Sequence, residues 1–211
     1  MAALIFGCSE EIKVDRGPCQ FPPNNLKFPT ADNDSDTSND YKDCPNCFIT
    51  LNIDGAVYRF TNDQINVGRA YNENNTALSL SNGSELFTIS ILSPKNADEI
   101  LATKGQFFPF VSNINSLLMA NQSPGAVYLE LKDYCKEIYP SEVSYLPEGQ
   151  EFPVSAYHKV NEVKIIDLYS SALGYIGDFE IKGEFTTYIK KDGKYLSITG
   201  SYLIVYRHIL F

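Results

Sequence analysis

Basic residues, histidine and long apolar runs are all scarce in this sequence of 211 residues. It contains 17 lysines and arginines against 26 acidic residues, which gives a formal net charge of −9. Nucleic-acid binding needs a basic surface over the phosphates, and electrostatic binding to anionic lipid needs basic clusters, so the charge argues against both. No apolar run approaches the roughly 20 residues that an α-helix needs to cross a bilayer.

Familiar catalytic motifs are absent as well. The only histidines are His158 and His208, and the chain has no H-E-x-x-H, G-x-S-x-G, P-loop or G-x-G-x-x-G pattern. His208 follows an alternating apolar segment, so we expect a structural role for it. Hydrolysis by a pair of carboxylates remains open, because acidic residues are numerous, but their spacing singles out no pair.

The chain is rich in apolar and aromatic residues. Hydrophobic residues make up 44% of it, with 14 tyrosines and 13 phenylalanines, which is typical of a globular protein. Residues 8–43 differ, because Asp, Asn, Ser, Thr and Pro crowd there and bury too little apolar surface to offset the entropy of ordering. The sequence therefore predicts a leader remnant at residues 1–7, a flexible acidic tether at 8–43 and a folded domain at 44–211.

Three pairs of apolar segments in the folded domain each flank a turn whose second residue is glycine. They are 48–53 and 56–61 around Asp54-Gly55, 76–81 and 85–92 around Asn82-Gly83, and 179–190 and 194–206 around Asp192-Gly193. Asn-Gly and Asp-Gly are strong hairpin signals, because both central residues of a type I′ turn need positive φ. The last pair alternates with period two, which indicates half-buried strands.

Two further strands are expected at residues 126–131 and 160–168, and only 97–103 and 113–120 favour short helices. The sequence thus predicts an all-β fold, an antiparallel β-sandwich or a partly open barrel.

The amino-terminal residues 4–8 read Leu-Ile-Phe-Gly-Cys. This pattern resembles the lipobox of bacterial lipoproteins, which implies that Cys8 is the mature amino terminus and carries a covalent lipid. Seven residues are too few for a signal peptide and include no Lys or Arg, so we expect the true start to lie upstream. The alternative is an ordinary apolar terminus beside a buried cysteine.

Ser9, Glu10 and Glu11 follow this cysteine directly. They resemble the acidic export signal of Bacteroidota surface lipoproteins, which implies an outer-membrane protein that faces the cell exterior. A G-x-F pattern within residues 177–185 and an I-T-x-G-x-F-like pattern from Ile198 onward resemble the closing strands of small all-β lipoproteins of unknown function in that group. The resemblance implies no catalytic residue.

Five cysteines leave an even set of four if Cys8 is acylated. That set is Cys19, Cys44, Cys47 and Cys135. Two disulfides with three possible pairings are expected in an exported protein. Cys44-Pro-Asn-Cys47 as a redox pair, a four-cysteine zinc site and buried free thiols remain alternatives.

Carboxylates recur within the tether at positions 1, 3, 5, 9 and 12 of a twelve-residue segment. They belong to Asp32, Asp34, Asp36, Asp40 and Asp43. With Cys44-Pro45 behind it, the segment resembles a single thrombospondin type 3 loop, which implies a calcium ion held by carboxylate oxygens. The alternative is a solvated, self-repelling linker.

Gln106-Phe-Phe-Pro-Phe110 is the most aromatic segment of the chain, and its proline excludes a central strand. Phe107, Phe108 and Phe110 either cap the core or form an apolar surface for a partner. The function expected is a non-enzymatic accessory module, lipid-anchored and docked on an outer-membrane protein complex. An extracellular hydrolase acting on glycans or peptides through carboxylates is the alternative.

Overall fold

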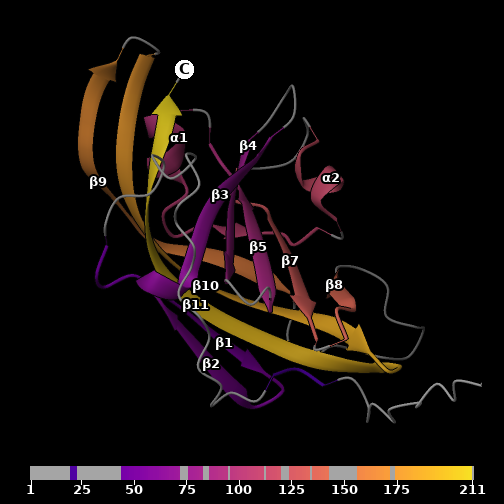
Figure 1. Ribbon diagram of the computed structural model, residues 1–211. Coiled ribbons are helices and arrows are strands. Elements are labelled where there is room, and N and C mark those ends of the chain that lie inside the picture. The colour runs from indigo at the N-terminus through magenta and orange to yellow at the C-terminus, as the bar shows by residue number, and fades with distance from the viewer. Residues whose placement is uncertain are drawn as a thin grey trace, which may run out of the picture.

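The computed structural model confirms the all-β fold (Figure 1). It describes residues 20–22, 44–71, 76–82, 86–94, 96–111, 113–119, 124–133, 135–142, 156–171 and 174–210. No helix in these ranges is long and apolar enough to cross a membrane.

The described elements are strands with two short α-helices and one 3₁₀ turn. In chain order they are β1 (Phe48–Ile53), β2 (Ala56–Thr61), η2 (Asn62–Gln64), β3 (Ile65–Tyr71), β4 (Thr76–Asn82), β5 (Phe87–Leu92), α1 (Ala97–Ala102), β6 (Phe107–Phe108), α2 (Ile114–Leu117), β7 (Val127–Lys132), β8 (Ile138–Glu142), β9 (Tyr157–Ser171), β10 (Gly174–Lys191) and β11 (Lys194–Leu210). The two helices lie where the sequence predicts them. Each is capped by the asparagine just before it, Asn96 or Asn113, whose side chain accepts a backbone N–H of the first turn.

The strands form one antiparallel sheet in the order β2-β1-β11-β10-β8-β7-β5-β4-β3. β10 connects its two halves. One edge of β10 pairs with β11 throughout, and the other edge pairs with β9 along residues 174–186 and with β8 at residues 188–189. The sheet folds over on itself at this strand, and its inner faces enclose the main core, which gives a partly open barrel (Figure 1).

Residues 105–111 cross the gap between β9 and β7. At one end the Gly105 N–H donates to the Val160 carbonyl of β9 at 2.7 Å. At the other end the Val111 N–H donates to the Val127 carbonyl of β7 at 2.8 Å. This segment, which contains the short strand β6, therefore joins the two halves of the sheet on the side where β10 passes from one neighbour to the other.

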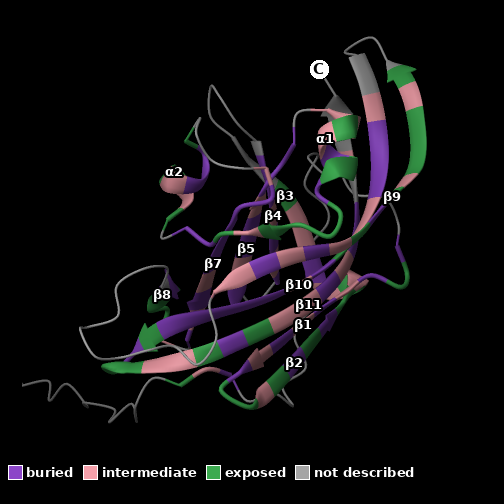
Figure 2. Cartoon of the chain, turned by 180° about the vertical axis from the view of Figure 1, so that it is seen from behind, coloured by how far each residue is buried: buried purple, intermediate pink, exposed green. Residues whose placement is uncertain are grey.

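The turn dipeptides adopt the backbone that hairpins require. Asp54 and Gly55 have φ of 49° and 91°, and Asp192 and Gly193 have φ of 51° and 75°, all in the left-handed region of a type I′ turn. The hairpins β1–β2 and β10–β11 form around the predicted turn dipeptides, with Ile53 opposite Ala56 and Lys191 opposite Lys194. Figure 2 shows buried residues between more exposed ones along β11, as the period-two pattern predicts. β10 differs, because residues 177–179 and 185–189 are buried on both faces of the strand.

Two glycines of β10 and β11 each lie opposite an aromatic residue on the other strand. Gly183 of β10 lies opposite Tyr202 of β11, and Phe185 lies opposite Gly200. A Cβ atom on Gly183 would lie 2.5 Å from the Tyr202 ring, and one on Gly200 would lie 2.2 Å from the Phe185 ring. Each ring therefore lies flat over the glycine of the neighbouring strand, where the two long strands bend (Figure 1).

Candidate functional site

The aromatic segment at residues 107–110 is divided between the surface and the core. Phe107 is 63% exposed, Phe108 is half-buried, and Phe110 is 5% exposed. The Phe110 ring meets the Phe185 ring edge-on at 6.1 Å between centroids, inside the main core. Of the three phenylalanines considered for partner binding, Phe107 alone is fully available at the surface.

Phe107 belongs to a small aromatic and basic surface built on β6 and β9. Strand pairing places Phe107 opposite Lys159, whose Nζ lies 5.2 Å from the ring centroid. The Tyr157 ring meets the Phe107 ring edge-on at 5.5 Å. We call Phe107, Tyr157 and Lys159 the Phe107 surface.

A buried histidine stands directly beneath this surface. His158 is fully buried; its Nδ1 lies 2.8 Å from the Gly125 carbonyl oxygen and its Nε2 lies 2.7 Å from the Tyr202 hydroxyl. A carbonyl only accepts, so Nδ1 carries the proton and Nε2 accepts from Tyr202. Burial lowers the pKa of His158 to about 4, against an opposing effect of the Gly125 hydrogen bond. The neutral imidazole therefore has a structural role, because its two hydrogen bonds connect β9 to the Gly125 backbone and to Tyr202 of β11.

This burial predicts a pH dependence of stability. In the unfolded chain the pKa of His158 returns to about 6.5, so that state binds more protons than the folded state between pH 4 and 6.5. The free energy of unfolding should therefore fall as the pH drops through this window, by at most about 3 kcal/mol from this residue. Urea denaturation of wild type and H158Q at a series of pH values measures it.

The stability difference between wild type and H158Q should shrink from pH 7 to pH 4. H208Q is the control, because it removes the only other histidine. A difference that stays constant across the window would contradict the assignment to His158.

A second buried polar cluster lies where β10 ends against the β7–β8 connection. Lys191 Nζ lies 2.8 Å from Asp133 Oδ2 and donates to the Tyr139 hydroxyl at 2.6 Å. Burial alone would raise the pKa of Asp133, but hydrogen bonds from Lys191, Tyr139 and the backbone N–H groups of Glu137 and Cys135 hold it below its usual value. Burial, then hydrogen bonds to Asp133 and Glu137, raise the pKa of Tyr139. The lowered pKa keeps the Asp133 carboxyl ionised at neutral pH.

Phe21 covers this cluster, although it lies within the segment expected to be a tether. Its ring meets the Tyr139 ring edge-on at 5.7 Å, and Lys191 Nζ lies 5.4 Å from its centroid. The neighbouring Pro22 carbonyl accepts a hydrogen bond from Tyr58 at 2.7 Å. Residues 20–22 are thus attached to the barrel. No local sequence signal marks this contact, because its members lie far apart in the chain.

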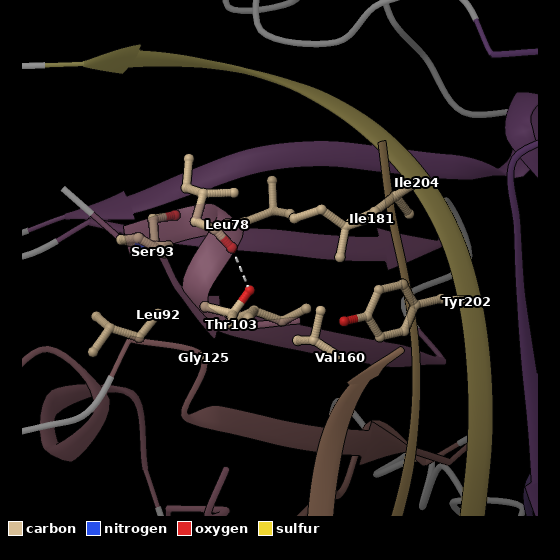
Figure 3. Close-up of a pocket in the computed structure, with 12 residues that line it drawn as sticks. Leu78, Leu92, Ser93, Thr103, Gly125, Val160, Ile181, Tyr202 and Ile204 are labelled. Carbon is tan, nitrogen blue, oxygen red and sulfur yellow. Dashed lines mark hydrogen bonds between the residues drawn. The ribbon is translucent and has the colours of Figure 1, made fainter. Parts of the chain in front are cut away.

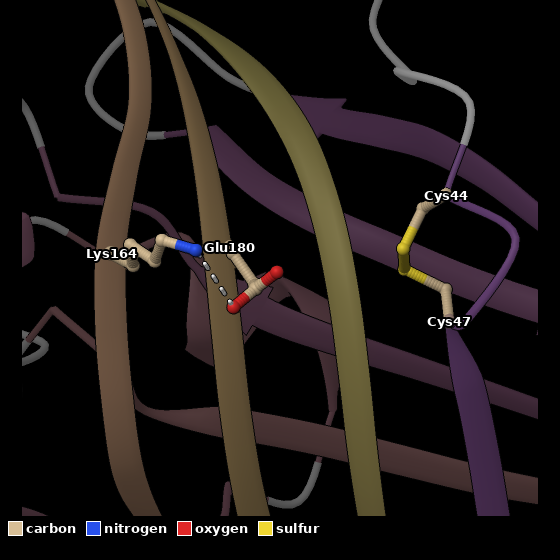
Figure 4. The surroundings of a disulfide bond; sticks show 4 residues. All are labelled: Cys44, Cys47, Lys164 and Glu180. Carbon is tan, nitrogen blue, oxygen red and sulfur yellow. Dashed lines mark ion pairs between the residues drawn. A yellow bond between two sulfur atoms is a disulfide. The ribbon is translucent and has the colours of Figure 1, made fainter.

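The cysteines confirm part of the disulfide prediction. Cys44 and Cys47 are bonded at an S–S distance of 2.03 Å, and their turn packs on Val205 at the outer side of β11 (Figure 4). Cys135 is also disulfide-bonded. These bonds remove the thiolates that the zinc alternative needs. Figure 4 also shows an exposed ion pair across β9 and β10, which contributes little.

The amino-terminal predictions lie outside the described residues. They concern the acylated Cys8, the export signal Ser9, Glu10 and Glu11, the disulfide candidate Cys19, and the calcium ligands Asp32, Asp34, Asp36, Asp40 and Asp43. Within the ranges that the structure does describe, no group of three or more His, Cys, Asp or Glu side chains is placed to hold a metal ion. Calcium and lipid therefore stay predictions.

Comparison with protein-family models, with curated proteins and with solved structures gives no significant match. The fold and its surface define the class of protein: an antiparallel β-domain, partly closed, with an exposed aromatic residue above a buried histidine.

Proposed function

We propose that this protein is a cell-surface lipoprotein that acts as a non-enzymatic binding module, docking its β-domain on an outer-membrane protein complex through the Phe107 surface. The exposure of Phe107 carries the proposal. Its ring has the largest exposed fraction among the large apolar side chains of the described residues. Large exposed aromatic rings dominate the energy of interfaces when a partner buries them.

The packing of Phe108 and His158 beneath Phe107 favours binding, because it restricts the movement of the Phe107 surface. Phe108 packs over Gly125, where a Cβ atom would lie 2.8 Å from its ring, and its centroid lies 6.0 Å from that of His158. His158 is held in turn by Tyr202. A preorganised aromatic side chain loses little conformational entropy on binding, so more of its burial appears as affinity.

The buried titratable groups also support a binding module over a hydrolase. Asp133 and His158 are the carboxyl and imidazole groups of the described residues with displaced pKa values. Both are buried, with hydrogen-bond partners inside the protein. Hydrolysis by carboxylates instead needs displaced pKa values in an open cleft.

The attachment of residues 20–22 limits how far the domain stands from its anchor. About 12 residues separate Cys8 from Gln20, and a fully extended chain of that length spans at most about 40 Å. A lipid on Cys8 would therefore keep the barrel close to the membrane, with the Phe21 end toward the anchor. Confinement of this kind raises the effective concentration for a membrane-bound partner.

The proposal is tested by purifying the native protein in mild detergent with F107S in parallel. F107S should reduce the amount of co-purifying outer-membrane protein at least tenfold, in line with the loss of an interface anchor worth about 2 kcal/mol. It should change the free energy of unfolding by less than about 0.5 kcal/mol, because the side chain is on the surface. An acylated Cys8 peptide in the mass spectrum of the same preparation is expected.

I138S is the matched control, since Ile138 is 54% exposed on β8. It should leave the partner bound. F110S distinguishes a surface effect from a core effect. It should lower the free energy of unfolding by about 3–5 kcal/mol, because Phe110 is buried in the main core. A partner retained by F107S, or turnover of a polysaccharide or peptide by the purified protein, would refute the proposal.

A further inference from the structure

An apolar pocket lies between the two halves of the sheet, beside α1 (Figure 3). Leu78 of β4, Ile181 of β10 and Ile204 of β11 form facing walls, and Ile100 of α1 closes one side. About 360 Å³ of space lies between the walls, including the part open to solvent, which is at the small end for a ligand pocket. The pocket is therefore small, and we call it the slot.

The lining carries no charged side chain. Its polar side chains are Ser93, Thr103 and Tyr202, and the last two already donate inside the protein, Thr103 to the Ile100 carbonyl at 2.6 Å and Tyr202 to His158 at 2.7 Å. Figure 3 shows the Tyr202 hydroxyl pointing into the space between the lining residues. A ligand would thus be held by apolar contact, and a charged or strongly polar group would lose its hydration without compensation.

The exposure of the lining residues indicates where the slot opens to solvent. Ile91 and Ile181 are half-buried, whereas Leu78, Val160 and Ile204 are buried. A ligand therefore enters beside Ile91 and Ile181. A head group would remain in solvent there while the apolar part lies inside.

Protein interiors are usually packed without such spaces, because unfilled apolar volume forfeits dispersion contacts. Hydrogen bonds hold the Thr103 and Tyr202 side chains at the wall of the slot, and Tyr202 also packs over Gly183. The small volume suits a thin methylene chain better than a ring.

We infer that this pocket binds the end of a linear aliphatic chain, such as the tail of a fatty acid or of a phospholipid. The inference stands on the pocket alone and goes beyond the proposed docking function. The chain enters beside Ile91 and Ile181 and ends near Tyr202. Free fatty acid and membrane lipid share this chemistry and are separated by the test.

The test is NMR of isoleucine methyl groups in the full chain, titrated with decanoate and, separately, with diheptanoylphosphatidylcholine, each below its micelle concentration. Saturable shifts are expected at the four lining isoleucines. These are Ile91, Ile100, Ile181 and Ile204. Ile138 and Ile166, which are exposed elsewhere, should not move. Binding of decanoate alone would identify free fatty acid, and binding of both would show that the chain alone is recognised.

I91W places a ring across the mouth and should weaken binding at least tenfold with an unchanged circular dichroism spectrum. I138W is the matched control and should bind as wild type. No saturable shift with either ligand, shifts spread over Ile138 and Ile166, or equal binding by folded I91W would overturn the inference. If I91W does not fold, the location of the methyl shifts in wild type decides the matter by itself.

Discussion

K191M should lower the free energy of unfolding by about 3–5 kcal/mol at pH 7, because it leaves the Asp133 carboxylate buried without its charge partner. The side chain of Asp133 is fully buried and that of Lys191 is 9% exposed, so solvent screens the pair little. Urea denaturation measures the loss. The neighbouring K190M is the matched control, since Lys190 is exposed, and it should cost less than about 0.5 kcal/mol.

The double variant D133N/K191M separates the ion pair from the packing of the two side chains. It should be more stable than the sum of the single changes implies, because neither charge is then left unpaired. The cost of K191M should also shrink at acidic pH, because burial favours the protonated form of a carboxyl that has lost its charge partner. Additive losses with no pH dependence would show that the charges do not interact as the geometry indicates.

G200A should destabilise the protein by about 3 kcal/mol, the upper end for an added methyl group in a packed core. The new Cβ would lie 2.2 Å from the Phe185 ring, which is buried and has no free space on the strand side. The ring would have to leave its site, with a loss of core packing. Thermal and urea denaturation measure the effect.

G68A is the matched control, because a Cβ atom on Gly68 of β3 would meet nothing within 4 Å. It should change stability by less than about 1 kcal/mol. F185L/G200A should recover part of the loss, since the smaller side chain vacates the space that the methyl group needs. If G68A and G200A cost the same, the effect is one of strand backbone and not of the ring above Gly200.

The strands were predictable wherever a turn dipeptide or a clear alternation marked them. The β1–β2 and β10–β11 hairpins and both short helices lie where the sequence indicates. β3 and β8 were missed, because Gly68 interrupts one and Pro140 the other, and both residues are depleted in strands. The expected tether was likewise interrupted by Phe21 and Pro22, whose contacts with the barrel have no local signal.

The candidate site was predictable only as a segment. Three phenylalanines around a proline indicated either a surface or a core position. Phe107 lies at the surface and Phe110 in the core because residues 105–111 pass from β9 to β7. Both strands are distant in the chain, so the segment's own sequence does not reveal this path. His158 was not singled out, since its partners Gly125 and Tyr202 lie 33 and 44 residues away.

The sequence by itself determined the local features of this protein: the type I′ turns, the period of its strands and the faces that they bury. These depend on the φ preferences of single residues and on side chains two positions apart. The tertiary structure alone decided the pairing of Lys191 with Asp133, the burial of His158, the glycine opposite each ring and the apolar slot. The physical reason is that each of these joins residues distant in the chain, so its energy appears only when the sheet folds over on itself and brings them into contact.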